Sequence, residues 1–559
     1  MNVVETVSQE SEPLVTGNDL VVRELLRQGV DTGFFLMGGP LTPLETQCIA
    51  AGIRMIDVRH EQAAAFMAQA YARLTGRPGV CMACSGPGTI NLTTGIANAF
   101  VDGVPMVAIG GSSPVAQYKM QAFQEVDQVG VMRPITKWAE RVYEVHRIAE
   151  YVDLAFKHAM TGKPGPVYLD LPGDILFHTV EESKTFHPRT VRNRTITRAK
   201  ADEGAIKDVV EMFGKAKQPL VLSGTGIIWS GASEALKTFV ERTGIPFYTT
   251  PQGRGVIPED HEYAYLNARS SAMREADFVL VVGTRLNYVL GFGEAPRINA
   301  DATIVQIDSD PEELARSGTI HYGVVGDARL VLEQLTAAVD GSVAGTFSGW
   351  RKHLAELHEE GRRKQEPMLN SDQVPIHPLR VCKEVRDFMD RDAVLVVDGQ
   401  EILNYGRQSL PTFVPGHRIN SGPFGTMGVG LPFGLGAKAA KPDKQVIVLH
   451  GDGSFGMNMQ ELDTAVRHKL PITVLVSLNG GWTADPEGKK AGSRLGYTRF
   501  DKIAETLGCH AEFVEKPADI RPALDRSKKA NAEGKVALIN VVTDAKARAY
   551  TARFAHYRT

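Results

Sequence analysis

The stretch from residue 446 to residue 481 combines a glycine-rich turn with oxygen-bearing side chains. An apolar run, VIVLH, leads into Gly451-Asp452-Gly453-Ser454, a helical pattern follows, and a second apolar run ends at Asn479. Glycines at a strand-to-helix turn let backbone N–H groups approach a phosphate, and the helix N-terminus adds a favourable dipole. This arrangement favours a phosphate-binding turn over a tight turn with an ordinary aspartate.

Asp452 and Asn479 both fall where a predicted strand ends. Open α/β sheets bind ligands at the carboxyl ends of their strands. A carboxylate, an amide oxygen and a backbone carbonyl are hard oxygen donors, and they suit Mg²⁺, which keeps some positions for water and phosphate. The sequence therefore predicts a magnesium site at the phosphate-binding turn.

A second cluster lies far upstream, around Glu61. This residue follows a short predicted strand and opens an alanine-rich, apolar helical pattern, so it lies at or near a helix N-terminus. A glutamate in that place is commonly only a partner of the helix dipole. The helix is followed by a glycine-proline turn, residues 85–88, and by another apolar helical pattern.

Together these segments resemble thiamine-diphosphate enzymes, whose motif is GDG followed downstream by NN. By this resemblance the metal ligands are Asp452, Asn479 and the backbone oxygen of Gly481, although Leu478 replaces the first asparagine of the pair. The resemblance also implies that Glu61 hydrogen-bonds the aminopyrimidine ring and starts a proton transfer to and from the reacting carbon. This role is general acid–base catalysis.

The resemblance covers nearly the whole chain and implies a full set of site residues. Gly425 and Met427 match the segment that bends the cofactor, and residues 399–401 match the loop that lines its diphosphate. Gln124 is implied to join the catalytic residues. The cofactor-binding residues implied are Glu61, Pro87, Gly399, Gln400, Glu401, Gly425, Met427, Gly451, Asp452, Gly453, Ser454, Asn479, Gly481 and Trp482.

The elements that must position these residues form three blocks. In each block short apolar runs alternate with longer helical patterns, which is typical of parallel α/β sheets. A chain of 559 residues is also too long for one core. We therefore expect three doubly wound α/β domains: residues 1–190 (pyrimidine-binding), 191–345 (central) and 376–559 (diphosphate-binding), with a charged, solvated linker at 346–375.

The central block has glycine turns after its predicted strands and an acidic residue, Asp308, that ends a strand. This pattern suggests a nucleotide crevice, with mere turns as an equal alternative. By resemblance such a domain holds FAD in acetolactate synthases and ADP in oxalyl-CoA decarboxylases. GTRLN and QIDSDPEEL favour ADP, with Lys163, Gly224, Arg285 and Asp308 as its binding residues.

Composition excludes several other classes of protein. Apolar residues make up 43% and charged residues 23%, which is ordinary for a globular protein. The formal net charge is −3 and there is no basic block, so nucleic acid is not an expected partner. No apolar run reaches the ~20 residues that a membrane span needs, so a membrane is not expected either. The polar, acidic N-terminus does not resemble a secretion signal. Five scattered cysteines indicate a reducing cytoplasm, and the CxxC at Cys81 and Cys84 has no second pair to complete a zinc site.

The choice of reaction also rests on resemblance. AFQEVDQVGVMRPITKW and the C-terminal tail resemble oxalyl-CoA decarboxylase and, most of all, 2-hydroxyacyl-CoA lyase. The tail mixes basic and aromatic residues, which suit a lid over the phosphates of an acyl-CoA, a frayed terminus being the equal alternative. Gly39 stands where relatives carry a branched residue, so it would enlarge the pocket.

We therefore predict a lyase that cleaves a 2-hydroxyacyl-CoA, branched or not, to a ketone or aldehyde plus formyl-CoA. Such a lyase needs a base for the 2-hydroxyl proton, and Glu487 is the candidate, against the alternative of a solvated loop carboxylate. The rival hypotheses are oxalyl-CoA decarboxylase, an acetolactate-synthase-like carboligase and a non-catalytic binding protein. The resemblance further implies a homo-oligomer, a dimer of dimers, with active sites between subunits.

Overall fold

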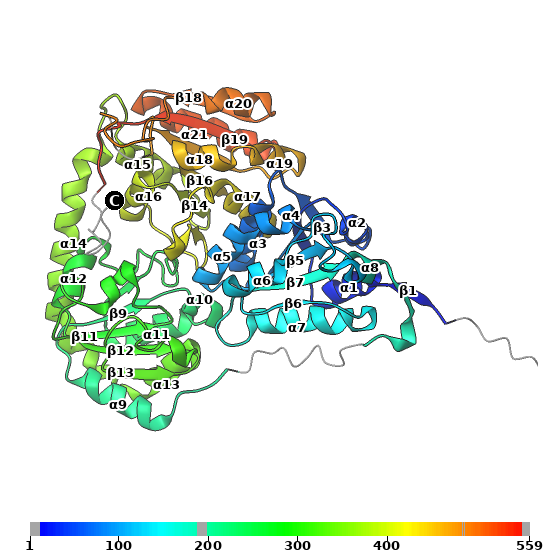
Figure 1. Ribbon diagram of the computed structural model, residues 1–559. Coiled ribbons are helices and arrows are strands. Elements are labelled where there is room, and N and C mark those ends of the chain that lie inside the picture. Colours follow the sequence, from blue (N-terminus) through cyan, green and yellow to red (C-terminus); the bar gives the residue numbers. More distant parts are fainter. Residues whose placement is uncertain (1–11, 187–197, 483–484, 486, 550–559) are drawn as a thin grey trace, which may run out of the picture. The chain divides into compact units, whose positions relative to one another are not determined.

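The computed structural model describes residues 12–186, 198–482, 485 and 487–549. These residues form two compact units, one made of residues 12–69 with 78–186 and the other of residues 70–77 with 198–549. Across the described ranges the strands form three parallel sheets and one two-stranded antiparallel ribbon, β1–β8. The expectation of parallel α/β architecture is confirmed (Figure 1).

The first unit is built on a sheet with strand order β3-β2-β4-β5-β7-β6. The alternate side chains of its strands pack against α1, α2 and α7 on one face. On the other face α3 lies so close to β4 that a Cβ at Gly79 would stand 2.0 Å from the Ala68 carbonyl oxygen. The strands are β1 Leu14–Thr16, β2 Thr32–Leu36, β3 Arg54–Asp57, β4 Gly79–Ala83, β5 Met106–Ser112, β6 Ala139–Arg141, β7 Pro166–Pro172 and β8 Thr179–Glu181, and the helices are α1 Gly17–Arg27, α2 Thr42–Ala50, α3 Glu61–Thr75, α4 Pro87–Asn91, α5 Thr93–Asp102, α6 Gln128–Met132, α7 Ile148–Met160 and α8 Gly173–Phe177.

The second unit contains the other two sheets, with strand orders β10-β9-β11-β12-β13 and β15-β14-β16-β17-β19-β18. The first of these sheets is built from β9 Pro219–Ser223, β10 Phe247–Thr249, β11 Phe278–Val282, β12 Thr303–Asp308 and β13 Tyr322–Val325, with α9 Glu203–Gly214, α10 Gly226–Ser230, α11 Ser233–Thr243, α12 Arg269–Glu275, α13 Ala328–Ala338 and α14 Ser348–Leu369. The second is built from β14 Val394–Asp398, β15 Arg418–Ile419, β16 Val446–Gly451, β17 Thr473–Leu478, β18 His510–Val514 and β19 Ala537–Val542, with α15 Pro378–Phe388, α16 Glu401–Ser409, α17 Gly430–Ala440, α18 Asp452–Asn458, α19 Glu461–Arg467, α20 Phe500–Thr506 and α21 Pro517–Ala532.

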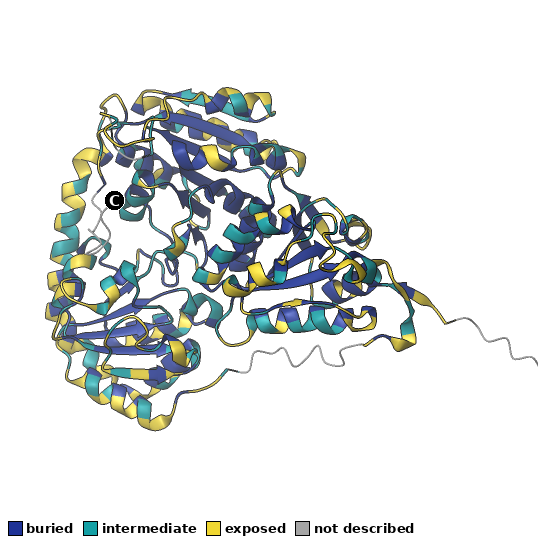
Figure 2. Ribbon diagram, viewed as in Figure 1, coloured by how far each residue is buried: buried dark blue, intermediate teal, exposed yellow. Residues whose placement is uncertain are grey.

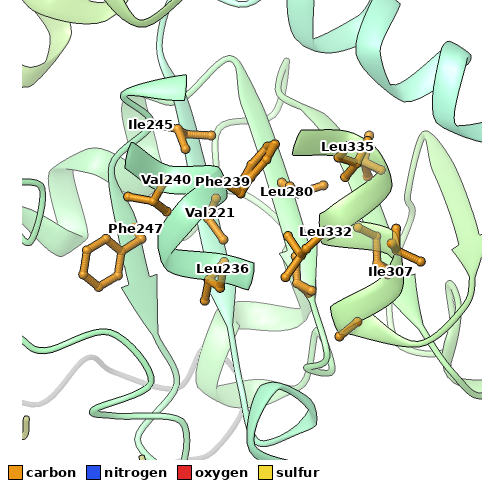
Figure 3. Packing of buried hydrophobic residues seen from close by; sticks show 14 of the residues in the cluster. Val221, Leu236, Phe239, Val240, Ile245, Phe247, Leu280, Ile307, Leu332 and Leu335 are labelled. Atoms are coloured by element: carbon orange, nitrogen blue, oxygen red, sulfur yellow. The ribbon is translucent and has the colours of Figure 1, made fainter. Parts of the chain in front are cut away.

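The inner strands of all three sheets are buried, while edge strands such as β13 and β18 and the outer faces of the helices are more exposed (Figure 2). Parallel strands covered on both faces read as continuous apolar runs, which explains why sequence patterning locates them. The five-stranded sheet illustrates the packing: side chains of its strands interleave with those of α11 and α13 around Phe239 and Leu332 (Figure 3). Along the described residues no helix is both long and apolar enough to cross a bilayer.

The segment expected to be a solvated linker is largely helix α14. Most of its side chains are exposed and several form i,i+3 or i,i+4 ion pairs. Trp350 and Leu354, one turn apart, are nevertheless buried among the residues that cover the five-stranded sheet, and the Trp350 indole donates to the Pro219 carbonyl at 3.1 Å. One face of α14 therefore belongs to the core of the second unit.

Removing a core side chain from this sheet should destabilise the protein without touching any candidate site. We expect Phe239→Ala to cost about 3–5 kcal/mol, because a buried aromatic ring is lost and a cavity remains. Thermal unfolding should show a lowered midpoint. Thr238→Ala, at the exposed neighbouring position on α11, should stay within about 0.5 kcal/mol. Equal midpoints for the two variants would contradict the core assignment.

Candidate functional site

An open pocket lies at the carboxyl ends of strands in the third sheet, β15-β14-β16-β17-β19-β18. Eleven of the residues that the sequence assigned to cofactor binding lie along it. The full set of lining residues is Pro378, Gly399, Gln400, Glu401, Ile402, Met427, Gly451, Asp452, Gly453, Ser454, Ser477, Asn479, Gly481, Trp482, Asp544 and Ala547. All of them belong to the second unit.

Two glycine turns meet at the floor of this pocket. Strands β14 and β16 are parallel neighbours, so the turns that follow Asp398 and His450 lie side by side. A Cβ on Gly399 would stand 2.9 Å from the Gly451 nitrogen, and Gly399 has a φ of +111°. Asp398 accepts the N–H groups of Gly399 at 2.6 Å and Gly430 at 2.9 Å, and burial raises its pKa to about 6. Glycine at 399 is therefore required by both conformation and space.

The predicted metal donors stand at the ends of neighbouring strands β16 and β17. Asp452 is 4% exposed, and its two carboxylate oxygens accept the N–H groups of Gly453 at 2.8 Å and Gly480 at 2.7 Å. Burial raises the pKa of Asp452 to about 6 and outweighs these hydrogen bonds, which lower it. The Asn479 amide oxygen accepts the Gly481 N–H at 3.2 Å.

The chemistry of this donor set suits magnesium. Among the residues that the structure describes, no three His, Cys, Asp or Glu side chains group as a metal site. A cation at Asp452 and Asn479 would therefore need backbone, water and ligand oxygens to complete its shell, as Mg²⁺ does when it binds a phosphate. Trp482 closes one side, because its ring lies 2.6 Å from the place of a Cβ on Gly453.

Sequence reasoning missed the contribution of the C-terminal strand to this pocket. Strand β19 is a parallel neighbour of β17, and Asp544 and Ala547 follow its end and line the pocket. The same carboxyl-end rule that located Asn479 could have located Asp544. The Ala549 N–H donates to the Glu401 carboxylate at 2.9 Å, so residues 544–549 lie against the helix that starts at the pocket. The tail from residue 550 on lies outside the described residues.

Glu61 is the first residue of α3 in the first unit and is 6% exposed. One carboxylate oxygen accepts the Asn91 amide N–H at 2.9 Å. The other carboxylate oxygen lies 3.2 Å from the position that a Cβ on Gly88 would occupy, and the Cys84 sulfur lies 2.5 Å from that position. Burial, followed by the charge of Glu61, raises the pKa of Cys84.

Three further residues named from the sequence lie near the turn before α4. Pro87 is the first residue of α4. The Gln124 amide oxygen accepts the Ser85 hydroxyl at 2.8 Å, and Gln124 has a φ of +59°. The Gly39 carbonyl accepts the Ser85 N–H at 3.3 Å, and a Cβ at Gly39 would meet nothing within 4 Å.

Of the catalytic and cofactor-binding residues predicted in the second unit, two do not line the pocket. Gly425 is exposed, with a φ of +72° and open space where a Cβ would point. The Glu487 carboxylate is largely exposed and pairs with Lys489. Met427, two residues after Gly425, does line the pocket.

The residues predicted to bind a nucleotide divide between the units. Gly224, Arg285 and Asp308 follow or end β9, β11 and β12, which are neighbours in the five-stranded sheet, so they share its carboxyl edge. A Cβ on Gly224 would stand 2.5 Å from the Thr284 side chain, so the two turns are in close contact. Lys163 belongs to the first unit.

A group of arginines in the second unit, with buried guanidinium N–H groups, was not anticipated from the sequence. Arg254 pairs with Glu259 and donates to the carbonyls of Arg407 and Leu410. In the part of the chain that the structure describes, Arg269, Arg407 and Arg418 form no ion pair. Their guanidiniums also keep buried N–H groups without an acceptor: Nε and Nη2 of Arg269, Nε of Arg407, and Nε and Nη2 of Arg418.

These arginines repel one another. Burial lowers the pKa of Arg269 most, and the charges of Arg297, Arg254 and Arg407 lower it further, to about 10. Burial is also the main cause that lowers the pKa of Arg407 and Arg418. Buried cations are normally paired, because an unpaired one loses its hydration without compensation. The cluster therefore has the character of an anion-binding site.

Comparison with known proteins agrees with this architecture. Residues 15–131, 206–335 and 404–541 match, in order, the N-terminal TPP-binding, central and C-terminal TPP-binding domains of thiamine pyrophosphate enzymes. The chain is 34% identical to 2-hydroxyacyl-CoA lyase of Arabidopsis thaliana, with 98% of this chain and 99% of that protein aligned. It is 34% identical to acetolactate synthase large subunit IlvG of Mycobacterium tuberculosis (94% and 95%) and 30% identical to oxalyl-CoA decarboxylase of Escherichia coli (95% and 95%).

The fold and these matches define a thiamine-diphosphate-dependent enzyme. The chain belongs to the thiamine pyrophosphate enzyme family, in the group that contains 2-hydroxyacyl-CoA lyases, acetolactate synthases and oxalyl-CoA decarboxylases.

A substitution at the floor of the pocket tests its geometry. In Gly399→Ala the new methyl group meets the Gly451 nitrogen and the backbone is strained, at about 1–3 kcal/mol. We expect magnesium-dependent binding of thiamine diphosphate to weaken by at least about tenfold, measured by calorimetric titration. Gly508→Ala, which has a φ of +91° but no close neighbour, carries backbone strain alone and should bind the cofactor like the parent. Similar weakening in both variants would show that backbone strain alone explains the effect.

Proposed function

We propose that this enzyme is a 2-hydroxyacyl-CoA lyase that cleaves its substrate to a ketone or aldehyde and formyl-CoA. Bound thiamine diphosphate supplies the carbon nucleophile and stabilises the carbanion, and the protein supplies binding, orientation and proton transfer. Mg²⁺ is assigned to Asp452, Asn479 and the Gly481 carbonyl, with the diphosphate over the glycine turns. The donor chemistry of these residues and their shared pocket support this assignment.

Glu61 is assigned the proton transfer that activates the cofactor. Its carboxylate is buried and one oxygen is held by Asn91, so it is oriented before any ligand arrives. Gln124 and Pro87 are assigned to the same site from the loop and helix next to it. A held carboxylate can accept and return a proton with little rearrangement, which is what general acid–base catalysis needs.

The observation that carries the acyl-CoA assignment is the arginine cluster. A small keto acid needs one cationic partner, whereas a coenzyme A ester brings several phosphate charges far from its reacting carbon. Arg269, Arg407 and Arg418 leave buried N–H groups without acceptors, and phosphate oxygens satisfy such groups well. Bound phosphate would also relieve the repulsion between these guanidiniums.

The geometry of α16 connects this cluster to the pocket. Glu401 begins the helix and lines the pocket, and Arg407 lies six residues further along the same helix. At about 1.5 Å per residue the two positions are about 9 Å apart along the helix axis. A long substrate can thus place its reacting end over the pocket and its phosphates at the arginines. Residues 544–549, which lie against Glu401, support the proposal that the C-terminal segment covers the substrate.

Gly39 supports a branched acyl group. Its φ does not require glycine and a Cβ would enter open space, so neither strain nor crowding explains the missing side chain. A wider pocket suits a substrate with two substituents on the hydroxyl-bearing carbon. Glu487 is our candidate for the base that removes the hydroxyl proton, because the lyase reaction requires such a base. In the structure its carboxylate pairs with Lys489.

We also propose ADP as the ligand of the central sheet, with Gly224, Arg285 and Asp308 at its carboxyl edge. The role of Lys163, which belongs to the first unit, stays a prediction from the sequence. The three domain boundaries and a cytoplasmic location remain proposals as well. A dimer of dimers is supported by apolar side chains exposed on the first unit. Met37, Met120 and Phe123 are among the most exposed of these, and exposed apolar side chains suit protein–protein contacts.

The reaction is tested with a panel of substrates given to the enzyme loaded with Mg²⁺ and thiamine diphosphate. We expect formyl-CoA from 2-hydroxyacyl-CoA esters, with 2-hydroxyisobutyryl-CoA cleaved faster than straight-chain esters and acetone as its second product. Glu61→Gln should lower turnover by about 10²–10⁴-fold, because an amide cannot exchange the proton. If oxalyl-CoA is the only substrate consumed and carbon dioxide is released, the decarboxylase is favoured. Acetolactate formed from pyruvate would favour the carboligase. No turnover of any substrate would favour a binding protein.

The arginine cluster is tested by Arg269→Met. Losing a charge-assisted hydrogen bond should raise KM for the CoA ester by about 10- to 100-fold, at about 1.5–3 kcal/mol, with little change in kcat. Removal of an unpaired buried cation should leave the melting temperature of the ligand-free protein unchanged or higher. Arg274→Met, on the exposed side of the same helix, should keep the parental KM. A KM unchanged in Arg269→Met would remove the support for a CoA substrate.

A further inference from the structure

A fully buried polar network lies beneath the turn that leads into α4 in the first unit. Its centre is Gln128, the first residue of α6, which is 1% exposed. The Gln128 amide nitrogen lies 2.9 Å from the Gly111 carbonyl oxygen and the Tyr168 hydroxyl, and 2.7 Å from a carboxylate oxygen of Asp170. Its amide oxygen accepts the Gly86 N–H at 2.5 Å.

The surrounding groups fix the orientation of this amide. Asp170 is fully buried and also accepts the Tyr168 hydroxyl at 2.7 Å, the Ser112 hydroxyl at 2.8 Å and the Arg141 guanidinium. A reversed Gln128 amide would point its oxygen at the Asp170 carboxylate and the Gly111 carbonyl. In a buried network each such mismatch is costly, so the Gln128 oxygen is held toward Gly86.

The turn at Gly86 connects this network to the candidate catalytic carboxylate through α4. Gly86 precedes α4 and has a φ of +61°. From α4, Asn91 donates to one oxygen of Glu61 and Gly88 lies next to the other. Ser85, on the other side of Gly86, donates to Gln124. The anchored turn therefore carries contacts to both catalytic residues proposed for this unit.

We infer that Gln128 is a positioning residue for Glu61: its amide oxygen anchors Gly86, and through α4 this anchor places the contacts that hold the Glu61 carboxylate. The inference rests on the proposed role of Glu61. Helix α4 has five residues, so its place depends strongly on how its ends are tied. A displacement of about 1 Å in a reacting group can cost about 10²-fold in rate.

Gln128→Met tests this inference, because methionine keeps the length and volume but offers no acceptor to Gly86. We expect kcat to fall about 10²-fold, with the protein still folded at the assay temperature and the dissociation constant of thiamine diphosphate within about threefold of the parent. The melting temperature should fall, because Gly111, Tyr168 and Asp170 lose a buried donor. Amide hydrogen exchange of the cofactor-free protein should be faster in the peptide that spans residues 85–91. Tyr168→Phe disturbs the same core but leaves the Gly86 contact, and it should lower kcat by no more than about threefold.

Gln128→Glu adds a readout that general loss of stability would not give. Burial and the neighbouring Asp170 raise the pKa of the introduced carboxyl, and Arg141 on the far side of Asp170 opposes this only in part. While protonated, this group can still donate to Asp170 and accept from Gly86. As the pH rises it ionises beside Asp170, so activity relative to the parent should fall toward alkaline pH and recover at lower pH.

The outcomes separate this inference from the proposed function. If Glu61→Gln keeps full turnover, the proposed function fails. If Glu61→Gln is inactive while Gln128→Met keeps the parental kcat and exchange, only the positioning role of Gln128 is overturned. It is also overturned if Tyr168→Phe loses as much activity as Gln128→Met, since the Gly86 contact would then have no special part.

Discussion

The carboxyl ends of parallel strands meet at one edge of a sheet, and the arrangement of the pocket depends on this constraint. At the edge of the third sheet the turns after β14 and β16 approach so closely that Gly399 has no room for a side chain beside Gly451. The same edge brings Asp452, Asn479 and the segment after β19 to one pocket. Backbone N–H groups and hard oxygen donors are thereby concentrated where a diphosphate and a magnesium ion would be bound.

Two kinds of buried polar group are found in this protein: some have hydrogen-bond partners among the described residues, and others do not. Around Asp170 and Gln128 the hydrogen-bonding groups find partners within the first unit, which makes the network a rigid support. In the second unit Arg269, Arg407 and Arg418 keep buried N–H groups that no described residue accepts. A satisfied network holds a structure in place, whereas unsatisfied cations favour an anion that arrives from outside. The proposed support of Glu61 and the proposed site for coenzyme A phosphates follow from this difference.

Relatives that are 30–34% identical carry three different activities in their names, so the reaction has to be argued from this chain's own residues. Gly39, with open space at its Cβ position, favours a larger acyl group. The arginine cluster favours an acyl-CoA over a free keto acid. Glu487, the proposed base for the substrate hydroxyl, pairs with Lys489 at an exposed position.

The sequence by itself determined the parallel α/β architecture and the local motifs. Buried parallel strands are apolar throughout, so runs such as VIVLH and FVLVV could be assigned directly, and the GDGS turn and Asn479 followed from the ends of those strands. Only the tertiary structure decided which distant residues meet: Gln128 beneath Gly86, and Arg269 with Arg407. These contacts join residues far apart in the chain or on different elements, and no periodicity or spacing in the sequence records them. It also decided that one face of the charged segment 346–375 is buried, because Trp350 and Leu354 find an apolar surface only in the folded unit.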